Sequence, residues 1–161
     1  MRRALPIAVL LAALLVPSGA QAAPGSLWAT VNVCDPPSAR NVIGIRASMP
    51  GNGTSQVMYM HFSAEWYSPS KKRWLATGST SPWVRAGSAR FRSMQRGYSF
   101  QFADPPKGAT FVMRGVVRYQ WRSARTGKVV MRRTRVTKGG YKGVAGGTPA
   151  GRSDASCRLE H

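Results

Sequence analysis

The chain has 161 residues, which is enough for one domain with a hydrophobic core and too few for two domains of ordinary size. It carries 24 lysines and arginines against five aspartates and glutamates, a formal net charge of +19. That charge attracts anionic partners without identifying one, because nucleic acid, acidic wall polymers and anionic lipid surfaces all satisfy the same electrostatics. The sequence has no motif of an enzyme nucleophile or of a metal site. We therefore expect a non-catalytic protein that uses no cofactor.

The first 22 residues have the three parts of a secretory signal peptide. Arg2 and Arg3 form a basic start, residues 7–16 are apolar, and Ala20-Gln21-Ala22 is a small-x-small cleavage site. The apolar run is about half of the roughly 20 residues that a membrane-spanning helix needs. We expect a signal helix that is removed after Ala22, by either the general or the twin-arginine route. The mature chain, with a net charge of about +17, would be extracellular and either free or associated with the cell envelope.

Two cysteines, Cys34 and Cys157, lie near opposite ends of the mature chain. Thiols exported to an oxidising space usually pair, and neither cysteine has a second Cys or a His at metal-ligand spacing. We expect a structural disulfide and no metal site.

Alternation of apolar and polar residues predicts antiparallel strands through the centre of the chain. The pattern has no helical periodicity, and turn residues recur about every 8 to 12 positions. Seven or eight strands in this arrangement predict a single β-sandwich domain over residues 23–138. The Gly-rich residues 139–161 are expected to form a flexible tail tied back by Cys157. The expected strands cover residues 27–34, 43–49, 57–67, 73–77, one or two short segments within 83–91, 98–102, 110–122 and 128–138.

Residues 109–138 are expected to form a long hairpin with its turn at Thr126-Gly127. A register that keeps most small or apolar residues inward pairs Val117 with Thr134 and Gly115 with Val136. In that register Arg118 lies opposite Arg133, Arg135 lies opposite Val116, and Arg114 is one pleat away.

The order and spacing of the expected strands are similar to those of immunoglobulin-like and fibronectin-type domains. In that comparison residues 57–67, 97–103, 110–122 and 128–138 resemble the third strand and the last three strands. The cysteines depart from the antibody pattern, because they are expected to join the first strand to the tail and not to bridge the two sheets. The layout also resembles small secreted proteins of unknown function from high-GC Gram-positive bacteria. These resemblances imply a fold and a compartment, and no activity.

The basic residues concentrate where the chain has no acid. Between Pro105 and Ser153 there is no Asp or Glu. Arginines interleaved with aromatic rings suit contacts with phosphate and sugar groups. The predicted partner is an anionic polymer, such as a cell-wall polymer, a nucleic acid or an acidic glycan. The residues expected to bind it, on the outer face of one sheet, are Arg114, Arg118, Arg133, Arg135, Tyr59, His61 and Tyr67.

Two other interpretations stay open at this point. In the first, the arginines serve only solubility and bind nothing. In the second, the domain binds a protein partner through an exposed sheet edge or through the region of Trp83. We expect a monomer in every case. Binding to a polyanion predicts strong salt sensitivity, whereas docking through apolar surface does not.

Overall fold

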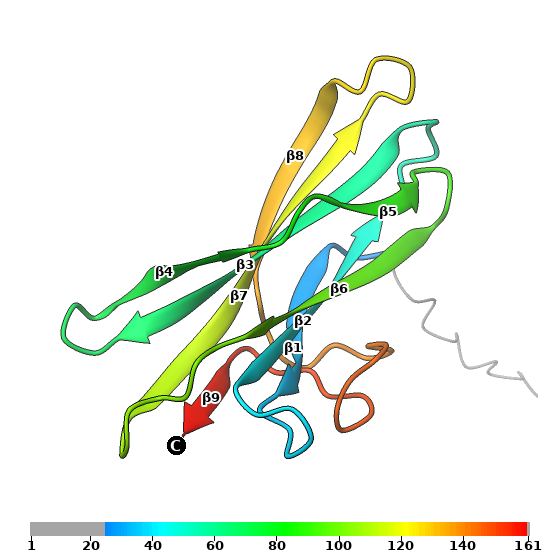
Figure 1. The fold of residues 1–161 in the computed structure, drawn as a ribbon. Helices are drawn as coiled ribbons and strands as arrows, with labels where there is room; N and C mark the ends of the chain where they lie inside the picture. Colours follow the sequence, from blue (N-terminus) through cyan, green and yellow to red (C-terminus); the bar gives the residue numbers. More distant parts are fainter. Residues whose placement is uncertain (1–24, 161) are drawn as a thin grey trace, which may run out of the picture.

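The computed structural model describes residues 25–160, and these residues form nine β-strands in two antiparallel sheets (Figure 1). The smaller sheet has the strand order β1-β2-β6. The larger sheet has the order β4-β3-β7-β8, with β5 also paired to β3 and β9 paired to β7. The strands are β1 (Trp28–Cys34), β2 (Val42–Pro50), β3 (Val57–Ser68), β4 (Arg73–Thr80), β5 (Val84–Ser88), β6 (Ser93–Gln101), β7 (Thr110–Arg122), β8 (Val129–Val136) and β9 (Cys157–Glu160).

The predicted all-β sandwich is therefore confirmed, with one strand, β9, that the sequence pattern did not indicate. The predicted signal peptide, residues 1–22, lies outside the described residues. Within residues 25–160, no helix has the length and apolar character needed to cross a bilayer.

β3 and β7 form the centre of the larger sheet. They pair over ten positions, from Val57 opposite Arg122 to Trp66 opposite Met113. Along both strands, buried residues alternate with half-buried or exposed ones, so one face of the sheet packs on the core and the other faces solvent.

The two sheets are in close contact where Gly115 of β7 faces Ile45 of β2. A Cβ atom at position 115 would lie 2.5 Å from Cδ1 of Ile45, a distance at which the atoms overlap. Nearby, the buried hydroxyl of Tyr119 donates a hydrogen bond to the carbonyl of Trp28 (2.7 Å), and its burial raises the pKa of Tyr119 far above its ordinary value. The core around these contacts includes the fully buried side chains of Ile43, Met49, Met58, Met60, Phe62 and Val117.

The Gly-rich segment after β8 folds back over the outer face of the smaller sheet (orange and red in Figure 1). Its main chain continues the sheet beside β1, where Val31 and Asp154 exchange two hydrogen bonds of 2.9 and 3.0 Å. Farther along, Asn32 donates to the carbonyl of Gly146 (2.7 Å), and Arg46 donates to that of Ala145 (2.7 Å). The composition of this segment predicted a flexible tail, whereas the structure gives it hydrogen-bond partners along its length.

The predicted disulfide between Cys34 and Cys157 is confirmed, with Cα atoms 5.3 Å apart. One detail of the prediction is wrong. Cys157 begins β9, which pairs with β7 of the larger sheet, while Cys34 ends β1 of the smaller sheet. The bond therefore bridges the two sheets. A structural disulfide indicates an oxidising compartment.

The predicted register of the β7–β8 hairpin is wrong by one residue. Next to the turn, Arg122 does pair with Val129, but Trp121 pairs with Met131, so Val130 is an extra residue in a β-bulge. Val130 is 58% exposed. Beyond the bulge every pairing is shifted, which places Arg118 opposite Thr134 and Val117 opposite Arg135.

Candidate functional site

The outer face of the larger sheet differs from that of the smaller sheet in being open. Each outward position of β3 from Val57 to Glu65, and of β7 from Thr110 to Arg122, is exposed or half-buried. We use the name outer basic face for the outward side chains of β3, β7 and β8, together with the two tryptophans that lean over them, Trp74 and Trp83.

One end of the outer basic face is an ion pair that lies against an aromatic ring. The guanidinium of Arg114 donates to Oε2 of Glu65 from Nε (2.8 Å) and lies 2.7 Å from the same oxygen through Nη2. The guanidinium carbon also sits 4.3 Å from the ring centre of Trp74, which in turn makes an edge contact with Tyr67. Because Glu65 neutralises the charge of Arg114, a ligand at this end would meet mainly the aromatic ring of Trp74 and no unpaired positive charge from Arg114.

The other end stacks one arginine on two rings. The guanidinium carbon of Arg122 lies 4.3 Å from the ring centre of Tyr59 and 5.0 Å from that of Trp83. Its Nε donates to Oε1 of Gln120 (2.9 Å). These contacts restrain the guanidinium against the two rings, and pre-orientation of this kind lowers the entropy lost on binding a ligand.

Between the two ends lies a concavity of about 170 Å³. Trp83 forms one wall, and the side chains of Arg118 and Arg132 come from neighbouring strands. Neither guanidinium has a carboxylate partner within residues 25–160. The other residues that line the concavity are Tyr119, Gln120, Arg133 and Thr134. A hollow with an indole wall and two unpaired guanidinium groups can hold an anionic group next to a flat ring.

His61 lies beneath Trp83 in this part of the face. The two ring centres are 5.1 Å apart, and His61 pairs directly across the strands with Arg118. Burial lowers the pKa of His61 below its ordinary value, and the positive charge of Arg118 lowers it further. His61 therefore favours its neutral form at neutral pH, and an anion bound beside Arg118 would oppose that effect.

Five of the residues predicted for the site lie on this face, and two do not. Tyr59, His61, Tyr67, Arg114 and Arg118 occupy outward positions on β3 and β7. Arg133 and Arg135 pair with Tyr119 and Val117, whose side chains point into the core, so the register places these two arginines on the opposite side of the sheet. Arg133 still contributes to the lining of the concavity, whereas Arg135 does not.

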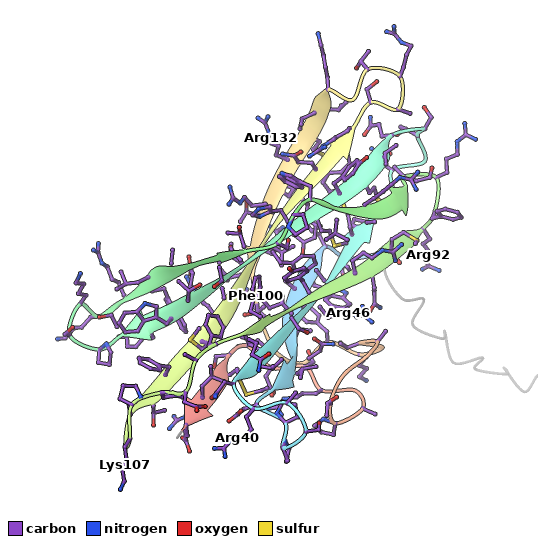
Figure 2. The ribbon with its side chains drawn as sticks, in the orientation of Figure 1. Arg40, Arg46, Arg92, Phe100, Lys107 and Arg132 are labelled. Atoms are coloured by element: carbon purple, nitrogen blue, oxygen red, sulfur yellow. A yellow bond between two sulfur atoms is a disulfide. The ribbon has the colours of Figure 1, made fainter. Side chains whose placement is uncertain are left out.

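Sequence reasoning missed four members of the face: Trp74, Trp83, Arg122 and Arg132. Arg122 follows Arg114 and Arg118 at the same four-residue spacing along one strand, so that spacing could have found it. Arg132 depends on the bulge at Val130, and Trp83 belongs to a connection without periodicity. Figure 2 shows Arg132 on β8, whereas Arg40, Arg46, Arg92 and Lys107 lie on other parts of the molecule, so net charge alone does not mark the face.

The free edge of β8 is occupied by its own arginines. The main-chain N–H of Thr137 donates a hydrogen bond to the carbonyl of Gly115 (2.9 Å). Because hydrogen-bonded and non-hydrogen-bonded positions alternate along an antiparallel pair, the main-chain N–H and C=O groups of Arg132 and Thr134 point away from β7. The guanidinium of Arg133 donates to the carbonyl of Arg132 (2.8 Å), and that of Arg135 donates to the carbonyl of Thr134 (2.9 Å). These bonds oppose the addition of a further strand at this edge.

Three aspartates have local partners. The carboxylate of Asp35 accepts a hydrogen bond from the main-chain N–H of Asn41 (2.5 Å), and that of Asp104 accepts one from the Asn41 side-chain amide. Asp154 forms an ion pair with Arg152 (2.7 Å). Asn41 thus links the loop after β1 to the loop after β6 through the carboxylates of Asp35 and Asp104.

No family model matches this chain, and no curated protein is significantly similar to it in sequence.

Proposed function

We propose that the protein is a secreted, non-catalytic binding module that adheres to an anionic polymer at the cell exterior through the outer basic face. The observation that carries the proposal is the concavity between Arg118, Arg132 and Trp83, where two unpaired guanidinium groups flank an aromatic wall. Guanidinium groups bind phosphate and carboxylate through paired hydrogen bonds, and an indole ring stacks on a sugar or a base.

The contrast between the two sheets supports this assignment. The segment after β8 covers the outer face of the smaller sheet and satisfies Asn32, Arg46 and Gln95 there. On the outer basic face, Arg118 and Arg132 are exposed and the aromatic rings beside them are only half-buried. Glu65 neutralises Arg114 alone.

We also infer that the sandwich is of the immunoglobulin-like type. The supporting observation is the strand order, in which β1, β2 and β6 are successive neighbours in one sheet while β3, β7 and β8 are successive neighbours in the other. β4 and β5 add to the free side of β3, as the extra strands of variable-type domains do. The disulfide between β1 and β9 lies outside the pattern of antibody domains.

The test is retention on phosphocellulose and on carboxymethyl cellulose over a range of salt concentrations. R118E/R132E should elute at much lower salt than wild type, because it reverses both unpaired charges of the concavity. R125E/R135E is the matched control: it changes the net charge equally within the same hairpin, but Arg125 lies in the turn and Arg135 on the other side of the sheet. It should lose far less retention.

W83A completes the design, because it removes the aromatic wall without changing any charge. It should weaken retention by about 1 kcal/mol or more if a ring of the polymer stacks there. Equal loss from the two charge-reversal variants would reduce the effect to net charge and would contradict a defined site. Capture of a protein partner that persists at high salt in all variants would favour a protein–protein module instead.

A further inference from the structure

The two sheets differ in length, and this difference leaves a gap at one end of the sandwich. β3 and β7 have 12 and 13 residues, whereas β2 and β6 have 9 each. At about 3.3 Å per residue, the larger sheet extends roughly 10 Å beyond the smaller one. In this region the core-facing side of the larger sheet is covered by the chain that leaves β6, around Phe102, and by no strand of the smaller sheet.

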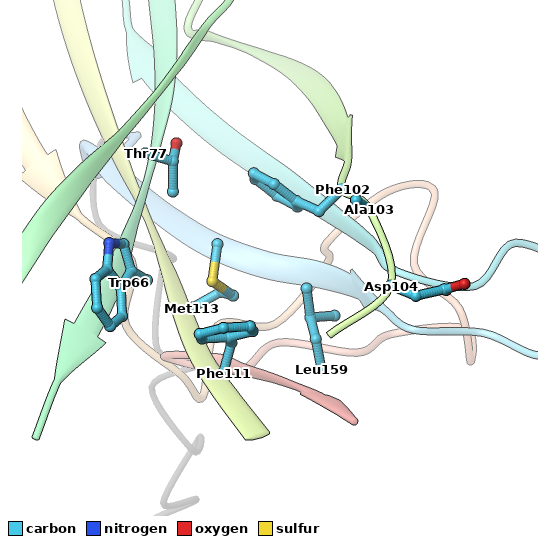
Figure 3. Close-up of a pocket in the computed structure, with 8 residues that line it drawn as sticks. All are labelled: Trp66, Thr77, Phe102, Ala103, Asp104, Phe111, Met113 and Leu159. Atoms are coloured by element: carbon cyan, nitrogen blue, oxygen red, sulfur yellow. The ribbon is translucent and has the colours of Figure 1, made fainter. Parts of the chain in front are cut away.

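The gap is a cavity of about 520 Å³ with apolar walls (Figure 3). Met113 of β7 and Leu159 of β9 form its buried floor. Trp66, Phe102 and Phe111 are only half-buried and form its sides, with Trp66 and Phe111 in an edge-to-face contact at 5.9 Å. Cavities of about 300 to 1,000 Å³ are the size that proteins use for small ligands.

Two polar side chains at the cavity, those of Thr77 and Asp104, already have hydrogen-bond partners. The hydroxyl of Thr77 donates to the carbonyl of Ala64 (2.9 Å). The carboxylate of Asp104 accepts a hydrogen bond from Asn41, and in Figure 3 it points away from the other lining side chains. Among residues 25–160, no lysine or arginine lines the cavity. A charged ligand would lose its hydration here without gaining a partner, whereas a neutral one would not.

We propose that this cavity is a second binding site, which takes one compact, neutral molecule with an aromatic ring or a short alkyl chain. The half-exposed rings of Trp66 and Phe111 supply flat surface against which such a molecule loses contact with water. The site lies on the side of the sheet opposite the outer basic face. The two sites would select ligands of different charge. One binds anions with a strong salt dependence, and the other binds an uncharged molecule whose affinity salt does not weaken.

The probe for the test is N-phenyl-1-naphthylamine, a neutral dye whose emission rises in apolar surroundings, titrated into the mature protein at low and high salt. We expect saturable binding of one dye per chain, undiminished by salt. A103W places a large side chain at the cavity wall and should weaken binding at least tenfold. A76W is the control, because Ala76 is an exposed residue of β4 that pairs with Glu65 on the outer side of the sheet. It should bind like wild type.

Methyl resonances of the wild-type protein give a second measurement that needs no variant to fold. The signals of Met113 and Leu159 should shift on addition of the dye, whereas those of Met49 and Met58 in the main core should not. Absence of saturable binding, equal binding by A103W and wild type, or shifts spread over all methionines would each overturn the proposal. None of these results bears on retention of the protein by anionic resin, so the two proposals can fail separately.

Discussion

Removal of the disulfide should cost the domain a large part of its stability. Cys34 and Cys157 are separated by 123 residues, so the bond restricts nearly the whole unfolded chain. In the chain-entropy description, a closed loop of that length contributes about 5 kcal/mol. Domains of this size have a free energy of unfolding of about 5 to 15 kcal/mol. C34S/C157S should therefore lose a third or more of that free energy, and its Tm should fall by roughly 15 °C.

Urea denaturation of the oxidised wild type, the reduced wild type and C34S/C157S measures this loss. The reduced protein and the variant should agree with each other, and both should show a larger m-value than the oxidised protein, because their unfolded chains expose more surface. β9 and the hydrogen bonds between Val31 and Asp154 remain available in the variant, so its native fold should persist. A loss below about 1 kcal/mol with an unchanged m-value would refute the reasoning that the bond acts on the unfolded chain.

Two further predictions concern the core and the pH dependence. G115A should lower the free energy of unfolding by about 1 to 3 kcal/mol in thermal or urea unfolding, because its methyl group overlaps Cδ1 of Ile45. Adding I45V, which removes that atom, should restore part of the lost free energy. The pKa of His61 is lowered below 6.5 in the fold, so the unfolded chain binds a proton at higher pH than the native one. The contribution of His61 to the free energy of unfolding should be constant above about pH 7 and fall as the pH drops below about 6.5. The difference between wild type and H61Q, followed by urea unfolding, isolates that contribution, and a pH-independent difference would contradict it.

The two central strands of the larger sheet could be predicted because each has one face in solvent and one face on the core. Along β3 and β7 the side chains alternate between core and solvent, and a period of two is visible in any such strand. The smaller sheet gives a weaker pattern. β1 is buried at five consecutive positions, since the returning segment covers its outer face, so polar residues such as Thr30 and Asn32 are buried as well.

β9 and the returning segment could not be found by periodicity. β9 has only four residues, and the segment before it interacts mainly through main-chain groups and turns. Glycine composition indicates the absence of side chains and says nothing about where carbonyl and N–H groups find partners. Gly146 is an example: at φ +65° its carbonyl accepts the hydrogen bond from Asn32, more than one hundred residues earlier in the chain.

The position of each arginine of the hairpin depends on one extra residue. The hydrophobic pattern of β7 requires its apolar residues to be inward, but β8 is an edge strand whose inward positions beyond Met131 are exposed, so its own pattern does not fix the register. The bulge at Val130 then decides that Arg132 joins the outer basic face and that Arg133 and Arg135 leave it. Arginines of similar sequence context thus acquire different roles, in the concavity or on the free strand edge.

The bulge at Val130 should make β8 unusually tolerant of a deletion inside the strand. Loss of Val130 would join Val129 directly to Met131, and their partners Arg122 and Trp121 are also adjacent, so the ladder would become regular without moving any residue beyond it. The variant lacking Val130 should keep the Tm of wild type within a few degrees and its retention on phosphocellulose. Deletion of Thr134 is the control, because it lies in the regular part of the ladder and its loss shifts the neighbouring Arg135 and Val136 by one position. If both deletions lowered the Tm equally, Val130 would not be the residue that sets the register, and the assignment of Arg132 to the outer basic face would lose its structural cause.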